Sequence, residues 1–167
     1  MKLTHMATVA LLAVVTLAGS LLIDAQDGKT IAVTAPRIGT VAIPSEEGVA
    51  RRTGQVIQIN FRNFPPDTET AQWFRHTPKE GDVRLQIDLF DRSGAPVAPG
   101  EYRLAGSTAR QAVIRVIDFQ ASTILTVPPT STGSVTVKKI DGSGISGSIS
   151  FTSPDSSVIG SFQSIFN

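Results

Sequence analysis

The sequence contains no cysteine. This absence excludes disulfide bonds, a zinc site built on thiolates, a cysteine nucleophile and a lipid-bearing cysteine behind an export signal. Histidine is almost as rare, because only His5 and His76 occur among the 167 residues. A histidine-rich metal site is therefore excluded, and a Ser-His-Asp triad would have to use His76. We expect no metal and no other cofactor.

Neither sign of charge dominates the chain. Lysine and arginine number 15 against 14 acidic residues, and the pI is near 8.1. Domains that bind nucleic acids usually carry a strong basic excess on one face. We therefore expect no nucleic-acid partner.

The N-terminus has the pattern of an export signal. Lys2 precedes an almost unbroken apolar run from Met6 to Ile23, which is typical of a signal peptide cleaved after Ala25, with residues 18–20 as a second cleavage site. The competing interpretation is an uncleaved anchor, because the run just reaches the length that spans a bilayer. Both place the protein outside the cytoplasm, secreted or periplasmic, and an uncleaved anchor would be its only membrane contact.

The remainder, residues 26–167, is expected to form one all-β domain, because Ser, Thr, Val and Ile are frequent and helical periodicity is absent. Residues 55–62 and 83–90 alternate apolar and polar positions, as half-buried strands do, and residues 112–119 are apolar on both faces, as a central strand is. We predict an antiparallel sandwich or open barrel of about eight or nine strands. Residues 44–53 are interpreted as a polar connection. Further strands are expected at residues 29–34, 39–43, 101–105, 122–127, 134–140, 145–152 and 157–166.

Glycines mark special positions in the last third of the chain. Gly147 and Gly160 stand at inward positions of expected strands, which predicts a close backbone approach or a bend at a barrel corner. Residues 142–147 match the dinucleotide-binding pattern GxGxxG letter for letter. Because they join two alternating strands and open no helix, we interpret them as a turn.

Four runs in this half of the chain support a resemblance: GEYRL at residues 100–104, GSVTV at 133–137, ISGSISFT at 145–152 and GSF at 160–162. Together they resemble the C-terminal half of exported bacterial β-sheet lipoproteins of unknown function, over about 65 residues. The resemblance implies an exported β domain and no particular catalysis. The cysteine that carries the lipid in such proteins is missing here.

A long connection, residues 63–82, separates two of the clearest strands, and loops of this length are usually functional or disordered. A short helix from Thr68 to about Arg75 is expected within it. Its aromatic side chains could seal one end of the barrel, or they could stack on a sugar or peptide. A third interpretation is acid/base catalysis by Glu69 or Glu80. The candidate binding residues here are Trp73, Phe74, Arg75 and His76.

A polar strand face supplies the other binding candidates, Arg62 and Arg84. It is either a solvated surface with cross-strand pairs or, if the sheet closes as a barrel, the lining of a pocket for an anionic or sugar-like ligand. The face comprises Gln58, Asn60, Arg62, Arg84, Gln86 and Asp88.

Three classes of function fit these features. We favour an exported binding or structural module without catalysis, whose partner is a protein or a surface glycan. A small-ligand-binding barrel and a hydrolase with loop carboxylates are the alternatives.

Overall fold

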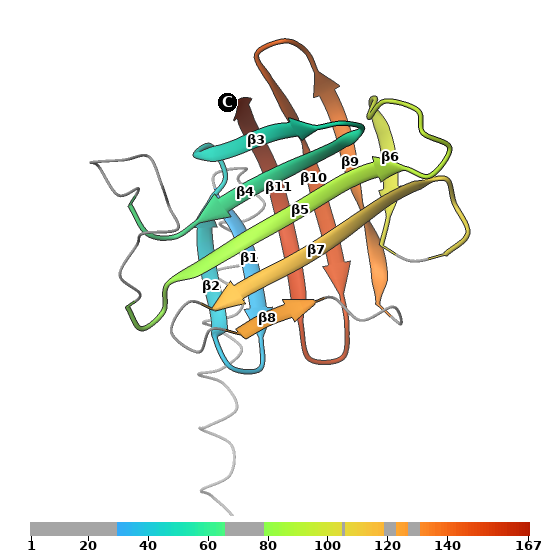
Figure 1. Ribbon diagram of the computed structural model, residues 1–167. Coiled ribbons are helices and arrows are strands. Elements are labelled where there is room, and N and C mark those ends of the chain that lie inside the picture. The colour runs from blue at the N-terminus through green and yellow to red at the C-terminus, as the bar shows by residue number, and fades with distance from the viewer. Residues whose placement is uncertain (1–29, 66–78, 105, 119–122, 127–130) are drawn as a thin grey trace, which may run out of the picture.

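Eleven β-strands and no helix form the described part of the chain (Figure 1). The computed structural model describes residues 30–65, 79–104, 106–118, 123–126 and 131–167. Across these ranges, nothing has the helical length and hydropathy needed to traverse a bilayer. The all-β prediction is confirmed, whereas the expected signal helix lies outside the described residues. The strands are β1 (Thr30–Ala35), β2 (Gly39–Pro44), β3 (Gly48–Thr53), β4 (Val56–Arg62), β5 (Val83–Asp91), β6 (Gly100–Arg103), β7 (Arg110–Asp118), β8 (Thr123–Thr126), β9 (Thr132–Ile140), β10 (Gly144–Thr152) and β11 (Ser157–Phe166).

Eight of these strands close into a barrel, in the order β10-β9-β6-β7-β5-β4-β3-β11 and back to β10. Two junctions in the ring are parallel and short: β11 meets β3 over three residue pairs, and β6 meets β7 at Arg103 and Gln111 alone. The sequence predicts an antiparallel sandwich or open barrel; the barrel is instead closed, and two of its junctions are parallel. The expected strand number matches the ring, but the total is higher because β1, β2 and β8 attach outside it.

The two parallel junctions divide the barrel into two layers. In Figure 1, β3, β4, β5 and β7 run diagonally in front of β9, β10 and β11. One edge of β11 is shared, since residues 157–160 pair with β1 and residues 164–166 pair with β3. Likewise β7 pairs with β6 at one end and with β8 at the other. The fold is thus a flattened barrel, intermediate between the predicted sandwich and a round barrel.

Apolar side chains fill the space between the layers. The alternation predicted for residues 55–62 and 83–90 is confirmed, because every second residue of β4 and β5 is buried. Each large side chain removed from water in this way contributes about 1.5–3 kcal/mol. The largest fully buried side chains are Tyr102, Phe61, Phe151, Ile31, Ile43, Ile59, Leu85, Ile87, Leu89, Ile114, Ile149 and Val33.

The interpretation of residues 44–53 as a connection is wrong, because β3 begins at Gly48. This strand directs only Gly48 and Ala50 inward, so it lacks the apolar alternation that reveals the other strands. A Cβ atom at Gly48 would collide with the Phe61 ring and the Ser164 hydroxyl. The small residues therefore let β3 approach β11 closely enough to close the barrel.

The expected roles of Gly147 and Gly160 are confirmed. The pairing of β9 with β10 shifts register between Ser146 and Gly147, and a Cβ at Gly147 would lie 2.9 Å from the Phe162 ring. A Cβ at Gly160 would lie 2.9 Å from the Cα of Ile31. Both glycines make room for close neighbours.

Candidate ligand-binding site

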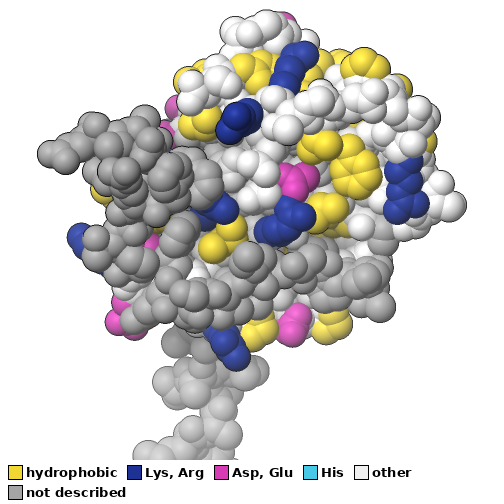
Figure 2. Space-filling view, viewed as in Figure 1, with side chains coloured by type: hydrophobic (Ala, Val, Ile, Leu, Met, Phe, Trp, Pro, Cys, Tyr) yellow, Lys and Arg dark blue, Asp and Glu magenta, His cyan; other side chains and the backbone are white. Residues whose placement is uncertain are grey.

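The polar side chains of β4 and β5 lie on the outer face of the front layer, opposite the core. Cross-strand pairing places Gln58 beside Asp88 and Asn60 beside Gln86. Figure 2, viewed from this side, shows basic, acidic and apolar side chains interspersed over the surface. The side chains are half-buried or, for Gln86, buried. The prediction that these residues share one face is confirmed, but the face is not freely solvated.

Asp88 is the hydrogen-bond acceptor at the centre of this face. Its Oδ1 accepts from Gln58 Nε2 at 3.1 Å, and Gln86 Nε2 donates to both carboxylate oxygens at 3.1 and 3.2 Å. Arg115 on β7 forms an ion pair with Oδ2. Its carboxylate is therefore already engaged by three side chains, which fixes their positions.

Arg62 and Arg84 lie directly opposite each other at the adjoining ends of β4 and β5. Like charges in directly opposed positions destabilise a sheet. Burial lowers the pKa of the Arg84 guanidinium, and the charge of Asp88 counteracts this effect. Because arginine stays charged in proteins, burial of the Arg84 guanidinium removes a charge from water and thereby lowers the stability of the fold.

A cavity of about 340 Å³ lies where β3 begins, β4 ends and β5 begins. Its described lining contains three arginines and a single carboxylate, Glu47, so positive charge is in excess there. We call it the arginine pocket. It is lined by Glu47, Val49, Arg51, Gln58, Asn60, Phe61, Arg62, Phe64, Arg84 and Asn167.

Nε of Arg62, a donor, and Oδ1 of Asn60, an acceptor, are shielded from solvent in the lining and form no hydrogen bond within the described structure. The amide nitrogen of Asn60 donates to Gln58 Oε1 at 3.4 Å. A buried polar group without a partner costs about 1–3 kcal/mol, so the pocket contains both a donor and an acceptor that a ligand could satisfy.

The structure brings together only part of the predicted site. Arg62 and Arg84 line one pocket, whereas Trp73, Phe74, Arg75 and His76 lie outside the described residues, as do Glu69 and the expected helix at residues 68–75. Glu80 is exposed.

Sequence reasoning missed the contribution of β3, from which Val49 and Arg51 join the pocket. Arg51 pairs across the sheet with Gln58, and Val49 with Asn60. The sequence does contain the two-residue spacing that places side chains on one face of a strand, because Val49 and Arg51 flank Ala50. This spacing predicts a shared face only if residues 48–53 are recognised as a strand.

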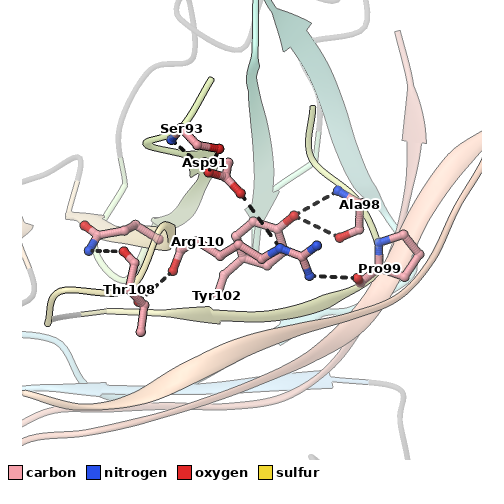
Figure 3. Close-up of polar contacts among 8 residues, drawn as sticks. Asp91, Ser93, Ala98, Pro99, Tyr102, Thr108 and Arg110 are labelled. Carbon is pink, nitrogen blue, oxygen red and sulfur yellow. Dashed lines mark hydrogen bonds and ion pairs between the residues drawn. The ribbon is translucent and has the colours of Figure 1, made fainter. Parts of the chain in front are cut away.

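A second polar cluster lies at the turn between β5 and β6 and holds the backbone in place (Figure 3). The Tyr102 hydroxyl donates to the carbonyl of Ala98 at 2.8 Å and accepts from its N–H at 2.9 Å. The Arg110 guanidinium lies 5.8 Å from the Tyr102 ring centroid and donates to the Pro99 carbonyl at 3.1 Å. Every one of these contacts is to neighbouring backbone or to a ring, so the cluster is structural.

Asp91 begins this turn. It accepts from the N–H and the hydroxyl of Ser93, at 2.9 and 2.6 Å, and lies 3.9 Å from Arg110. The hydrogen bond from the Ser93 hydroxyl is the main reason why the pKa of Asp91 is lowered.

The described residues include no group of three acidic or histidine side chains that could hold a metal ion. No family model, no curated protein and no solved structure matches the chain. The resemblance to exported lipoproteins stays a prediction.

Proposed function

We propose that the protein is an exported binding module without catalysis, which recognises an anionic partner through the arginine pocket. Export rests on the apolar N-terminal run behind Lys2. The binding role rests on one observation above all: Arg62 and Arg84 are opposed on neighbouring strands and line the same cavity.

Electrostatics favours an anion as the partner. Arg51, Arg62 and Arg84 line one pocket in which Glu47 is the single carboxylate of the described lining, and Asp88 at the centre of the face interacts with Gln58, Gln86 and Arg115. Guanidinium groups form planar, paired hydrogen bonds with carboxylate, sulfate and phosphate. A bound anion would therefore offset the excess of positive charge in the pocket lining.

The position of the pocket favours a partner that approaches from outside over a ligand enclosed by the barrel. The interior is occupied by apolar side chains such as Tyr102, Phe61 and Phe151. Most of the side chains that β3, β4 and β5 contribute to the pocket lie on the outer face of these strands, which suits a partner that presents a single anionic group. A carrier that encloses its ligand would need space inside the barrel instead.

The test measures binding of the purified chain to three immobilised polyanions: polygalacturonate, dextran sulfate and polyphosphate. We expect at least one of them to bind, and the double variant Arg62→Gln/Arg84→Gln to bind at least about tenfold more weakly, a loss of about 1.4 kcal/mol. The matched control, Arg37→Gln/Arg92→Gln, removes the same charge from exposed turn positions and should bind like the wild type. Binding to none of the three, or equal weakening by both double variants, would refute the proposal.

A further inference from the structure

The arginine pocket combines three kinds of chemistry. The guanidinium groups of Arg62 and Arg84 supply charge and planar donors, and the amides of Gln58 and Asn60 supply donors and acceptors. Val49, Phe61 and Phe64 add apolar surface, and Phe64 is only 5% exposed. A simple inorganic anion would use the donors alone and would leave the acceptors and the apolar surface unused.

The acceptor of Asn60 narrows the class of ligand. Its amide nitrogen is directed at Gln58, so the orientation of the amide leaves Oδ1 as the atom without a partner. A carboxylate, sulfate or fully ionised phosphate has no hydrogen to donate to that oxygen. A ligand that carries hydroxyl groups beside its anionic group can satisfy Asn60 and Arg62 together.

The size and the apolar part of the pocket agree with a sugar ring. A volume of about 340 Å³ lies at the lower end of the range for small-ligand pockets. One face of a pyranose carries C–H groups, which suit contact with Val49 and Phe64, while its hydroxyls and carboxylate project from the rim. A peptide carboxylate can offer a neighbouring N–H to Asn60, but it has no ring face of C–H groups beside it.

We infer that the arginine pocket binds one uronic acid unit, with the carboxylate on Arg62 and Arg84 and a neighbouring hydroxyl donating to Asn60 Oδ1. This inference rests on the proposed function and specifies its ligand. The unit belongs either to a free sugar acid or to an acidic polysaccharide, and the two sources share this chemistry.

The experiment compares ligands that differ in one feature at a time, by chemical-shift titration of the purified chain. The two uronosides are methyl galacturonoside and methyl glucuronoside. Four comparison ligands each change one feature: methyl galactoside lacks the charge, cyclohexanecarboxylate lacks the hydroxyls, galactose 6-phosphate carries a different anion, and glutamate is an amino-acid carboxylate. We expect at least one uronoside to bind at least about tenfold more tightly than each of the other four. Equal or tighter binding of any of these four would overturn the inference.

Two variants assign the recognition to atoms. Arg62→Gln should reduce uronoside binding to the level of the galactoside, and Asn60→Val should reduce it to the level of cyclohexanecarboxylate while leaving cyclohexanecarboxylate itself unaffected. Arg37→Gln, in the turn after β1, should change nothing. An Asn60→Val chain that folds and keeps full preference for the uronoside would refute the role of Asn60; if it does not fold, the ligand comparison in the wild type decides.

A trigalacturonide distinguishes the two sources. Tighter binding of the trimer than of the monomer supports a polysaccharide, and exclusion of the trimer supports a free sugar acid. If a polyanion binds through Arg62 and Arg84 but no uronoside does, this inference fails and the proposed function stands. If no polyanion binds either, both fail.

Discussion

Arg62 on β4 and Arg84 on β5 occupy directly opposed positions of an antiparallel strand pair, so two arginines share one half-buried stretch of the sheet. A protein optimised for stability alone would place opposite charges in such a pair. Binding sites are commonly regions where stability is sacrificed for function. The pair should therefore show opposite effects on stability and on binding when one charge is removed.

The first prediction concerns Arg62→Gln. Removing one of the opposed charges should raise the free energy of unfolding by about 0.5 kcal/mol, measured by urea denaturation at low ionic strength, while it weakens polyanion binding. The gain should shrink in high salt, because the Debye length falls from about 10 Å at 0.1 M to about 3 Å at 1 M. Arg37→Gln is the control and should leave stability unchanged. A clear loss of stability in Arg62→Gln would show that Arg62 has a structural role instead.

Alternation of apolar and polar residues was enough to predict the inward and outward faces of most strands. It succeeded where a strand has several large inward side chains, as β4 has in Ile57, Ile59 and Phe61. It failed for β3, whose inward positions are Gly48 and Ala50. Alternation also could not predict that the barrel closes, because the parallel junctions depend on contacts between distant parts of the chain.

The candidate site was predictable in composition but not in geometry. The two-residue period indicated that Gln58, Asn60 and Arg62 share one face, and that Arg84 lies on the corresponding face of β5. Whether Arg62 is opposite Arg84 or opposite Gln86 depends on strand register. Only short hairpin turns fix register from sequence, and here the connection between the strands is long. The pocket became visible only with the register in place.

The second prediction tests the close approach at Gly147. A Cβ there would collide with the carbonyl oxygen of Thr136 and with the Phe162 ring, neither of which can move without disturbing the barrel. Gly147→Ala should therefore lower the free energy of unfolding by about 2 kcal/mol or more. Gly142→Ala is the matched control, since a Cβ at Gly142 meets nothing within 4 Å. It should change stability by less than about 0.5 kcal/mol, and equal effects of the two changes would contradict the argument.

The third prediction concerns Tyr102→Phe, which removes a hydroxyl and keeps the buried ring. Both the N–H and the carbonyl of Ala98 lose their partner. We expect a loss of about 1–3 kcal/mol in the free energy of unfolding, together with faster hydrogen exchange at the Ala98 amide. Exchange at the amides of β4, on the other layer, serves as the internal control in the native state. Unchanged protection at Ala98 would show that the hydroxyl does not hold this turn.

The last prediction follows from the turn between β9 and β10. The Asp141 carboxylate accepts from Lys139 Nζ at 2.7 Å and from the hydroxyl and N–H of Ser143 at 2.6 and 2.8 Å, and the N–H of Gly144 donates to it as well. The bond from Lys139 is the largest cause of a pKa far below the ordinary 3.8, and the hydroxyl of Ser143 is the next. The folded state thus prefers the ionised form more strongly than the unfolded state does.

Because the folded pKa is depressed, the stabilisation is fully present above the unfolded value and is lost as the pH falls from there through the folded value. Asp141→Asn keeps the acceptor oxygen for Ser143 and removes the charge. The wild type should therefore melt at a higher temperature than Asp141→Asn at pH 7, and the gap should narrow steadily below about pH 4. In a Lys139→Gln background the difference in melting temperature between the chain that keeps Asp141 and the chain with Asp141→Asn should be smaller at every pH, since the largest cause of the lowered pKa of Asp141 has been removed. A gap that stays constant down to about pH 2.5 would show that the charge of Asp141 is not what stabilises this turn.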